Sequence, residues 1–236
     1  MMNTLNSLIV AICIAGLFNG AGCSERSKED AADRSNTVEK EASEKTDIRA
    51  VIETERGTFT IMLRPDLAPQ STANFVNLAQ RGFYHGREVV GSNMGSASFG
   101  QGKATPLYKI KNEYSPDLIF DKPGIVAWTF VDTKAGTTNQ IPHPTRFFVT
   151  KAAKEEWTFQ YCPFGEVIDG QDVVNRSQRG DWIKSVRIVG DWQPFMEQHA
   201  AMVENWNTAL RLAGEFAPGE QDATLGGSAP PTINSN

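Results

Sequence analysis

Apolar and polar residues alternate along residues 49–63, on either side of the polar stretch Glu55-Arg56-Gly57. Alternation places one set of side chains on each face of a strand, and a short polar stretch with a glycine is typical of a tight turn. The pattern therefore predicts a β-hairpin. Short apolar runs predict further strands at residues 124–130, 146–150, 164–168 and 183–189.

Residues 71–81 show the three- and four-residue spacing of apolar side chains that is typical of a helix. We expect Ser71 to cap its N-terminus and Gly82 to end it. Val173 and Val174 indicate a second, short helix. Many short strands with two helices favour an all-β fold in which a closed barrel is capped at its ends.

The last part of the chain changes character after residue 192. Residues 193–214 predict an amphipathic helix that ends at Gly214, because apolar residues recur at helical steps, namely Phe195, Met202, Val203, Trp206, Leu210 and Ala213. This helix either packs back on its own barrel or docks a partner protein. Residues 215–236 are rich in Pro, Gly, Ser and Asn and are expected to form a disordered tail.

The N-terminus carries an apolar run at residues 8–18, which is too short to span a bilayer and has the length of a signal peptide. It leads into Gly20-Ala21-Gly22-Cys23, which resembles a bacterial lipoprotein signal with Cys23 as the lipidation site. A plain secretory signal over residues 1–23 is the alternative. Residues 24–46 are charged and polar and predict a flexible tether. We expect a protein of the cell envelope that meets the membrane only through its lipid anchor.

Composition sets further bounds. The chain has 236 residues, 40% of them apolar, and a formal net charge of -5, which suits one core of ordinary size and argues against binding nucleic acid. Cys162 is the one cysteine in the folded part, so no internal disulfide is expected. The three histidines, His85, His143 and His199, lack metal-ligand spacing, so no metal site is expected.

Residues 56–86 read RGTFTIMLRPDLAPQSTANFVNLAQRGFYHG and closely resemble the opening of the cyclophilins, without a gap. Further matches lie at residues 122–124, 146–150, 164–170 and 183–189, so the resemblance covers about residues 48–190. We expect one domain of this type over residues 47–192. The resemblance implies an eight-stranded antiparallel β-barrel closed by two helices. It also implies a peptidyl-prolyl cis-trans isomerase that acts on proline-containing polypeptides without a cofactor.

The reaction of this family is rotation about an X-Pro bond, whose barrier is ~18–20 kcal/mol because amide resonance must be broken. At the half-turned geometry the proline nitrogen can accept a hydrogen bond. The resemblance implies an arginine that stabilises this state more than either planar one, and an apolar pocket that grips the proline ring.

The segment REVVGSNMGSASFGQG, residues 87–102, lies where the family reads x-x-F-H-R-V-I-P-G-F-M-I-Q-G-G-D. Compared without gaps, Gly91 occupies the position of the catalytic arginine. Ser96 and Ala97 occupy the Phe-Met pair of the pocket, and Phe99 occupies its glutamine. The segment also lacks the spacing of a nucleotide phosphate loop. We therefore expect reduced or lost catalysis.

Other positions of the pocket are retained or altered. The resemblance places Phe148 at the floor of the proline pocket and Trp157 at its wall, while Tyr161 stands for a histidine and Phe99 for a glutamine. Together they are the candidate substrate-binding residues. Phe148 has an alternative role as one aromatic of an alternating strand packed in the barrel core.

Two arginines are candidates to replace the missing guanidinium. Arg146 stands where the family has glutamine, at the border of the active site, and Arg87 lies four residues before Gly91. Three functions remain open at this stage: a slow isomerase of the cell envelope, a non-catalytic peptide-binding module, and a scaffold whose C-terminal helix docks a partner.

Overall fold

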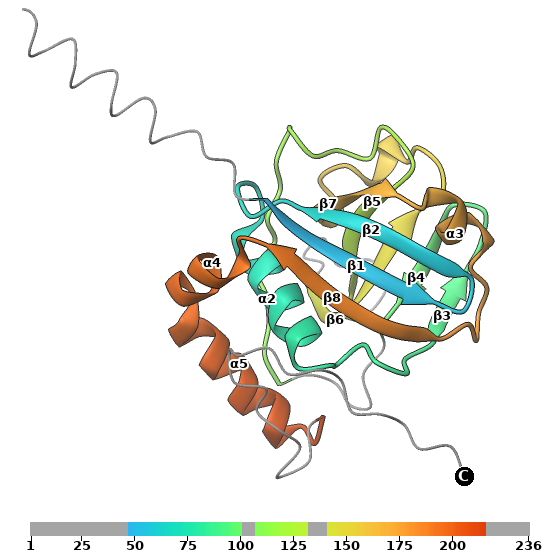
Figure 1. The fold of residues 1–236 in the computed structure, drawn as a ribbon. Coiled ribbons are helices and arrows are strands. Elements are labelled where there is room, and N and C mark those ends of the chain that lie inside the picture. The colour runs from blue at the N-terminus through green and yellow to red at the C-terminus, as the bar shows by residue number, and fades with distance from the viewer. Residues whose placement is uncertain (1–46, 101–106, 132–140, 216–236) are drawn as a thin grey trace, which may run out of the picture. The chain divides into compact units, whose positions relative to one another are not determined.

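The computed structural model describes residues 47–100, 107–131 and 141–215 (Figure 1). The expected signal, tether and lipidation residue Cys23 lie outside these residues, as does the tail beyond Glu215. Among the described residues, no helix combines the length and the apolar character needed to cross a bilayer.

Eight antiparallel strands and several helices make up the fold, with the strands in the order β3-β4-β6-β5-β7-β2-β1-β8. The elements are β1 (Ile48–Thr54), β2 (Gly57–Leu63), α2 (Pro69–Gln80), β3 (Val89–Ser92), β4 (Ser96–Phe99), β5 (Ile125–Phe130), β6 (Pro142–Thr150), the 3-10 turn η1 (Glu155–Trp157), β7 (Cys162–Asp169), α3 (Gln171–Arg176), β8 (Ile183–Gly190), α4 (Trp192–Gln198) and α5 (Ala200–Leu212).

The predicted hairpin is confirmed. β1 and β2 pair from Arg49 opposite Met62 to Thr54 opposite Gly57. Gly57 has a φ of +128°, a region that residues with a Cβ rarely adopt, and an added Cβ would lie 3.0 Å from Val173. The glycine therefore permits both the tight turn and the close approach of α3.

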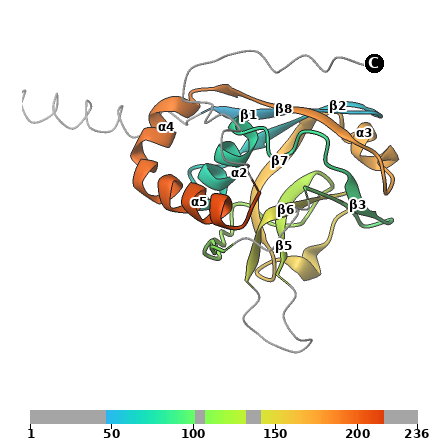
Figure 2. The same ribbon diagram turned by 90° about the horizontal axis from the view of Figure 1, so that it is seen from below.

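The two ends of the strand order are joined by backbone hydrogen bonds next to β3 and β8. The N–H of Val89 donates to the carbonyl of Asp181 at 2.8 Å, and the N–H of Ile183 donates to that of Arg87 at 2.8 Å. The sheet thus curls into a barrel, as both views show (Figures 1 and 2). The expected all-β class and eight-stranded antiparallel architecture are confirmed.

Aromatic side chains fill the interior of the barrel. Phe75 of α2 is fully buried and lies 5.4 Å from the ring of Phe147 and 5.5 Å from that of Phe164. Burial of each such side chain stabilises the fold by about 1.5–3 kcal/mol, so α2 is fixed to the barrel mainly by its apolar face. α3 lies far from α2 in both views, near the opposite end of the strands (Figures 1 and 2).

The start of α2 differs from the sequence prediction. The helix begins at Pro69 rather than at Ser71, and Ser71 is buried within its first turn. The backbone N–H groups of Gln70 and Ser71 donate to the two carboxylate oxygens of Glu113 at 2.9 and 2.8 Å. A carboxylate at a helix N-terminus satisfies free N–H groups and complements the helix dipole, so a distant residue supplies the cap.

The C-terminal region forms two helices, α4 and α5, instead of one continuous helix. Four of its apolar side chains are buried in the main core, namely Phe195, Met196, Trp206 and Leu210. The ring of Trp206 stacks on that of Tyr108 with centroids 5.6 Å apart. Both views place the two helices beside α2 (Figures 1 and 2). The region therefore packs back on its own domain, and these side chains are not available for docking a partner.

Candidate functional site

The side chains of β6 alternate between the barrel interior and its outer face. Phe147 and Val149 belong to the interior core, whereas Phe148 belongs to a separate apolar cluster. We call this set the outer aromatic cluster; it consists of Leu118, Phe120, Ile125, Ala127 and Phe148, with Leu67, Trp157 and Tyr161 packed against them. The structure thus places Phe148 outside the barrel interior.

Three of the candidate substrate-binding residues come together in the outer aromatic cluster. The ring of Phe148 lies 5.5 Å from Trp157, edge to face at 90°, and 4.9 Å from Tyr161 at 79°. Phe148 is only 3% exposed because these rings and Phe120 enclose it, while Trp157 and Tyr161 are half-buried. Burial raises the pKa of the Tyr161 hydroxyl, which stays neutral. The cluster therefore offers the edges of Trp157 and Tyr161 rather than an open Phe148 face.

Phe99 does not belong to this cluster, which corrects its sequence assignment. It pairs with Phe147 across β4 and β6, is fully buried, and stacks on the Phe147 ring at 5.3 Å inside the barrel. Ser98 is the β4 residue opposite Phe148. A shift of one residue in register exchanges the two faces of a strand, so the ungapped comparison assigned the wrong face to Ala97 and Phe99.

Gly91 lies on the same face of the sheet as Phe148. It pairs with Ser98 on β4, and Ser98 pairs in turn with Phe148 on β6. Residues directly opposite each other point to the same face, and two strand spacings separate Gly91 from Phe148 by roughly 10 Å. A Cβ added at Gly91 would meet nothing within 4 Å, and the residue does not have a positive φ. Gly91 therefore lies at an open position, where a longer side chain would be sterically free.

Arg146 precedes Phe148 by two residues on β6, so its side chain leaves the same face. Its Nε donates to Thr129 Oγ1 at 2.9 Å and its Nη2 to the carbonyl of Phe130 at 3.3 Å. These bonds hold the guanidinium against the end of β5. Arg146 thus lies beside Thr129 and Phe130, and two of its donor nitrogens are engaged by the protein.

Arg87 is bound elsewhere. Its Nη2 lies 3.0 Å from the carboxylate of Glu215, and the two side chains are 16% and 0% exposed. Its Nε donates to the carbonyl of Phe83 at 2.7 Å, and its guanidinium lies 4.1 Å from the centre of the Phe83 ring. Arg87 links the residues that follow α5 to the barrel, and its guanidinium is engaged there rather than near the outer aromatic cluster.

Residues 49–191 of the chain match the protein-family model described as "Cyclophilin type peptidyl-prolyl cis-trans isomerase/CLD". The chain belongs to this family. The cyclophilin assignment agrees with the sequence resemblance and with the eight-stranded barrel.

Curated relatives and solved structures agree with the assignment. A peptidyl-prolyl cis-trans isomerase of Synechococcus elongatus is 33% identical over 150 residues, covering 61% of this chain and 97% of the relative. Peptidyl-prolyl cis-trans isomerase A of Mycobacterium tuberculosis is 32% identical over 142 residues, or 52% and 74% of the two chains. The crystal structure of a Cryptosporidium parvum cyclophilin matches with a TM-score of 0.53 at 21% identity, covering 61% and 98%, and supports the fold.

Two further aromatic residues, Phe120 within this cyclophilin's outer aromatic cluster and Phe130 beside it, were not expected from the sequence. Phe120 stacks on Phe148 with centroids 6.1 Å apart, and Phe130 stacks on Tyr161 at 4.2 Å. Phe120 carried no signal, because it lies in a segment without regular periodicity. Among the described residues, no group of three His, Cys, Asp or Glu side chains is placed to hold a metal ion.

Proposed function

We propose that this cyclophilin binds proline-containing polypeptide segments at the outer aromatic cluster and isomerises X-Pro bonds slowly or not at all. The observation that carries the proposal is Gly91, which lies in the row of Ser98 and Phe148 with open space where a guanidinium would act. An apolar surface binds the planar and the twisted amide alike. Binding of this kind does not lower the barrier, because only interactions that are stronger in the transition state do so.

The substrate class is supported by the relatives. Those reported above are named peptidyl-prolyl cis-trans isomerases, and the Cryptosporidium parvum cyclophilin was also solved in the presence of the dipeptide Ala-Pro. The edges of Trp157 and Tyr161 supply the apolar contact for a proline ring.

A protease-coupled isomerisation assay on a proline tetrapeptide tests the proposal. Loss of one well-placed donor costs about 10²–10³ in rate, so we expect at most a weak acceleration over the uncatalysed reaction. The Synechococcus relative, assayed in parallel, is the control. A rate near that of the relative would contradict the proposal. If weak activity is found, Arg146→Ala should remove it only if Arg146 supplies the donor.

We also propose that the domain is held at the cell envelope by a lipid on Cys23. The apolar run at residues 8–18 followed by Gly20-Ala21-Gly22-Cys23 supports this location. With Cys23→Ala, we expect the full-length protein to move from the membrane fraction to the soluble fraction. Cys13→Ala, which leaves the processing site intact, is the matched control. Retention of Cys23→Ala in the membrane fraction would count against lipidation.

A further inference from the structure

A hollow of about 730 Å³ lies where the β1–β2 turn, the β3–β4 turn and the end of α3 meet. Its lining includes three cations and three side-chain amides, namely Arg56, Lys151, Arg176, Asn93, Asn175 and Gln178. None of the residues that line it is an Asp or a Glu. The hollow shares no residue with the outer aromatic cluster.

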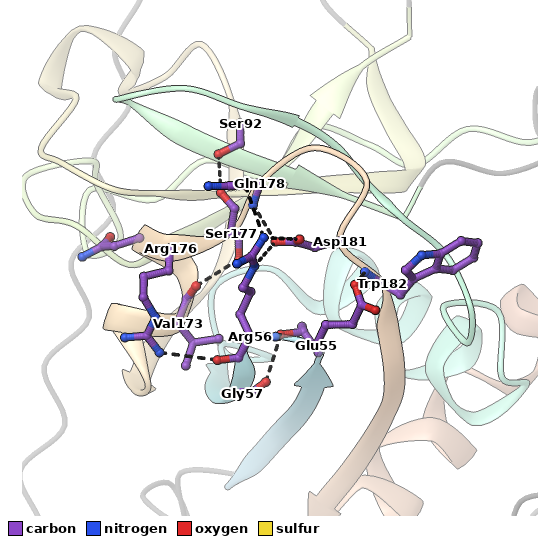
Figure 3. Close-up of polar contacts among 12 residues, drawn as sticks. Glu55, Arg56, Gly57, Ser92, Val173, Arg176, Ser177, Gln178, Asp181 and Trp182 are labelled. Carbon is purple, nitrogen blue, oxygen red and sulfur yellow. Dashed lines mark hydrogen bonds and ion pairs between the residues drawn. The ribbon is translucent and has the colours of Figure 1, made fainter.

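The two arginines keep donor groups that their own ion pairs do not use. Nε and Nη2 of Arg56 contact the two carboxylate oxygens of Asp181, each at 2.8 Å. Arg176 pairs through Nη1 with Asp172, and its Nη2 donates to the carbonyl of Arg56 (Figure 3). Nη1 of Arg56 and Nε of Arg176 make no hydrogen bond within the described part of the chain. These two groups remain available to a ligand.

Lys151 adds a charge that no carboxylate neutralises among the described residues. Its Nζ donates to Ser92 Oγ at 2.7 Å and to the carbonyls of Asn175 and Ser177 at 3.1 and 3.2 Å. All three partners are neutral. Partial burial lowers the pKa of this ammonium group. A nearby anion would stabilise the charged form of Lys151 through space.

The three amides are oriented by bonds to their oxygens. Asn93 Oδ1 accepts from the N–H groups of Gly95 and Ser96, at 2.7 and 2.9 Å. Asn175 Oδ1 accepts from the side chain of Gln171 at 3.0 Å, and Gln178 Oε1 accepts from Arg56 Nη2 at 3.2 Å.

Because each amide oxygen already accepts a hydrogen bond, the NH₂ group of each amide is the part that can donate to a ligand. No acceptor within the described residues takes these NH₂ groups. The hollow is therefore lined by donors and positive charge without a matching set of acceptors, which is the arrangement that an oxyanion satisfies.

We propose that this hollow binds a phosphate-type oxyanion, either as inorganic phosphate or as the monoester group of a larger ligand. Phosphate carries several strong acceptor oxygens and close to two negative charges, so it can accept hydrogen bonds from more than one of these donors. A carboxylate has only two oxygens and one charge and would leave more of the donors unsatisfied.

Titration of the ¹⁵N-labelled domain with inorganic phosphate, at constant ionic strength against chloride, tests the proposal. We expect saturable shifts of the side-chain amide resonances of Asn93, Asn175 and Gln178. Because a hydrogen bond to a charged group is lost, Arg176→Gln should weaken the apparent affinity about tenfold. Arg176 is exposed and its pair with Asp172 lies at the surface, so this variant keeps its fold.

Lys184→Gln is the matched control, because Lys184 is an exposed cation of β8 outside the hollow. It should bind phosphate as the unaltered domain does. Non-saturating shifts that chloride reproduces, or equal affinity of Arg176→Gln and Lys184→Gln, would overturn the proposal. Titration with glycerol 3-phosphate distinguishes inorganic phosphate from a phosphate monoester as the preferred ligand. Tighter binding than that of inorganic phosphate indicates a monoester, and weaker binding indicates the free ion.

Discussion

Gly91→Arg is expected to raise kcat/KM for a proline tetrapeptide at least about tenfold. In other enzymes one well-positioned donor contributes a factor of ~10²–10³ to the rate, and the tenfold gain is a part of that factor. The residue has open space and an ordinary backbone conformation, so an arginine fits without strain. Its side chain leaves the face that carries Phe148, at a distance that a guanidinium can span. We expect the gain in kcat rather than in KM, since the new bond forms with the twisted amide.

Gly91→Met is the matched control, because it adds length and apolar contact without a donor. It should leave kcat unchanged. If Gly91→Arg is folded and still inactive, the missing guanidinium is not what limits the rate. The enclosure of Phe148 by Phe120, Trp157 and Tyr161 would then be the cause.

Glu215→Ala is expected to lower the free energy of unfolding by about 3–5 kcal/mol, because it removes one partner of a largely buried ion pair with Arg87. Glu215 is fully buried at the end of α5 and pairs with Arg87 at 3.0 Å. Urea denaturation followed by far-UV circular dichroism measures the change.

Glu204→Ala, at an ion pair on α5 itself, provides the control. Glu204 pairs with Arg211 at 3.0 Å, but the two side chains are 67% and 43% exposed. Removing such a surface pair changes stability by about 0.5 kcal/mol or less. Equal effects of Glu204→Ala and Glu215→Ala would show that the buried pair does not hold α5. Arg87→Met combined with Glu215→Leu should recover much of the loss, because it removes both charges.

The strands were predictable because their signals are local. Alternation and turn residues located β1, β2 and β8 to within one residue at each end. β6 is longer than expected, since Pro142 and Pro144 carry no strand preference in the sequence yet lie within it. Pairing with β5 imposes the extended conformation on the first residues of β6. The sequence near these residues does not reveal this pairing.

Features that depend on residues far apart in the chain were missed. Glu113 caps α2 from 43 residues away, and Glu215 pairs with Arg87 across 128 residues. Nothing in the neighbourhood of either acid distinguishes it from a surface carboxylate. The break at His199 between α4 and α5 was also missed, because the apolar spacing continues through it.

Three of the candidate residues meet in space, but the register of β4 was not predicted. Phe148, Trp157 and Tyr161 form one cluster, and Gly91 lies on the face of the sheet that carries Phe148. Phe99 was assigned to the wrong face, because a difference of one residue in register exchanges the inward and outward positions of a strand. An ungapped comparison has no information on that change.

The position of β1 bears on how the domain responds to force. β1 is an inner strand, paired along its length with β2 on one side and β8 on the other. A pull on the chain ahead of Ile48 therefore loads two ladders in shear, and neither can be unzipped bond by bond as an edge strand would be. A domain held by its N-terminus is thus attached through one of its mechanically most resistant strands.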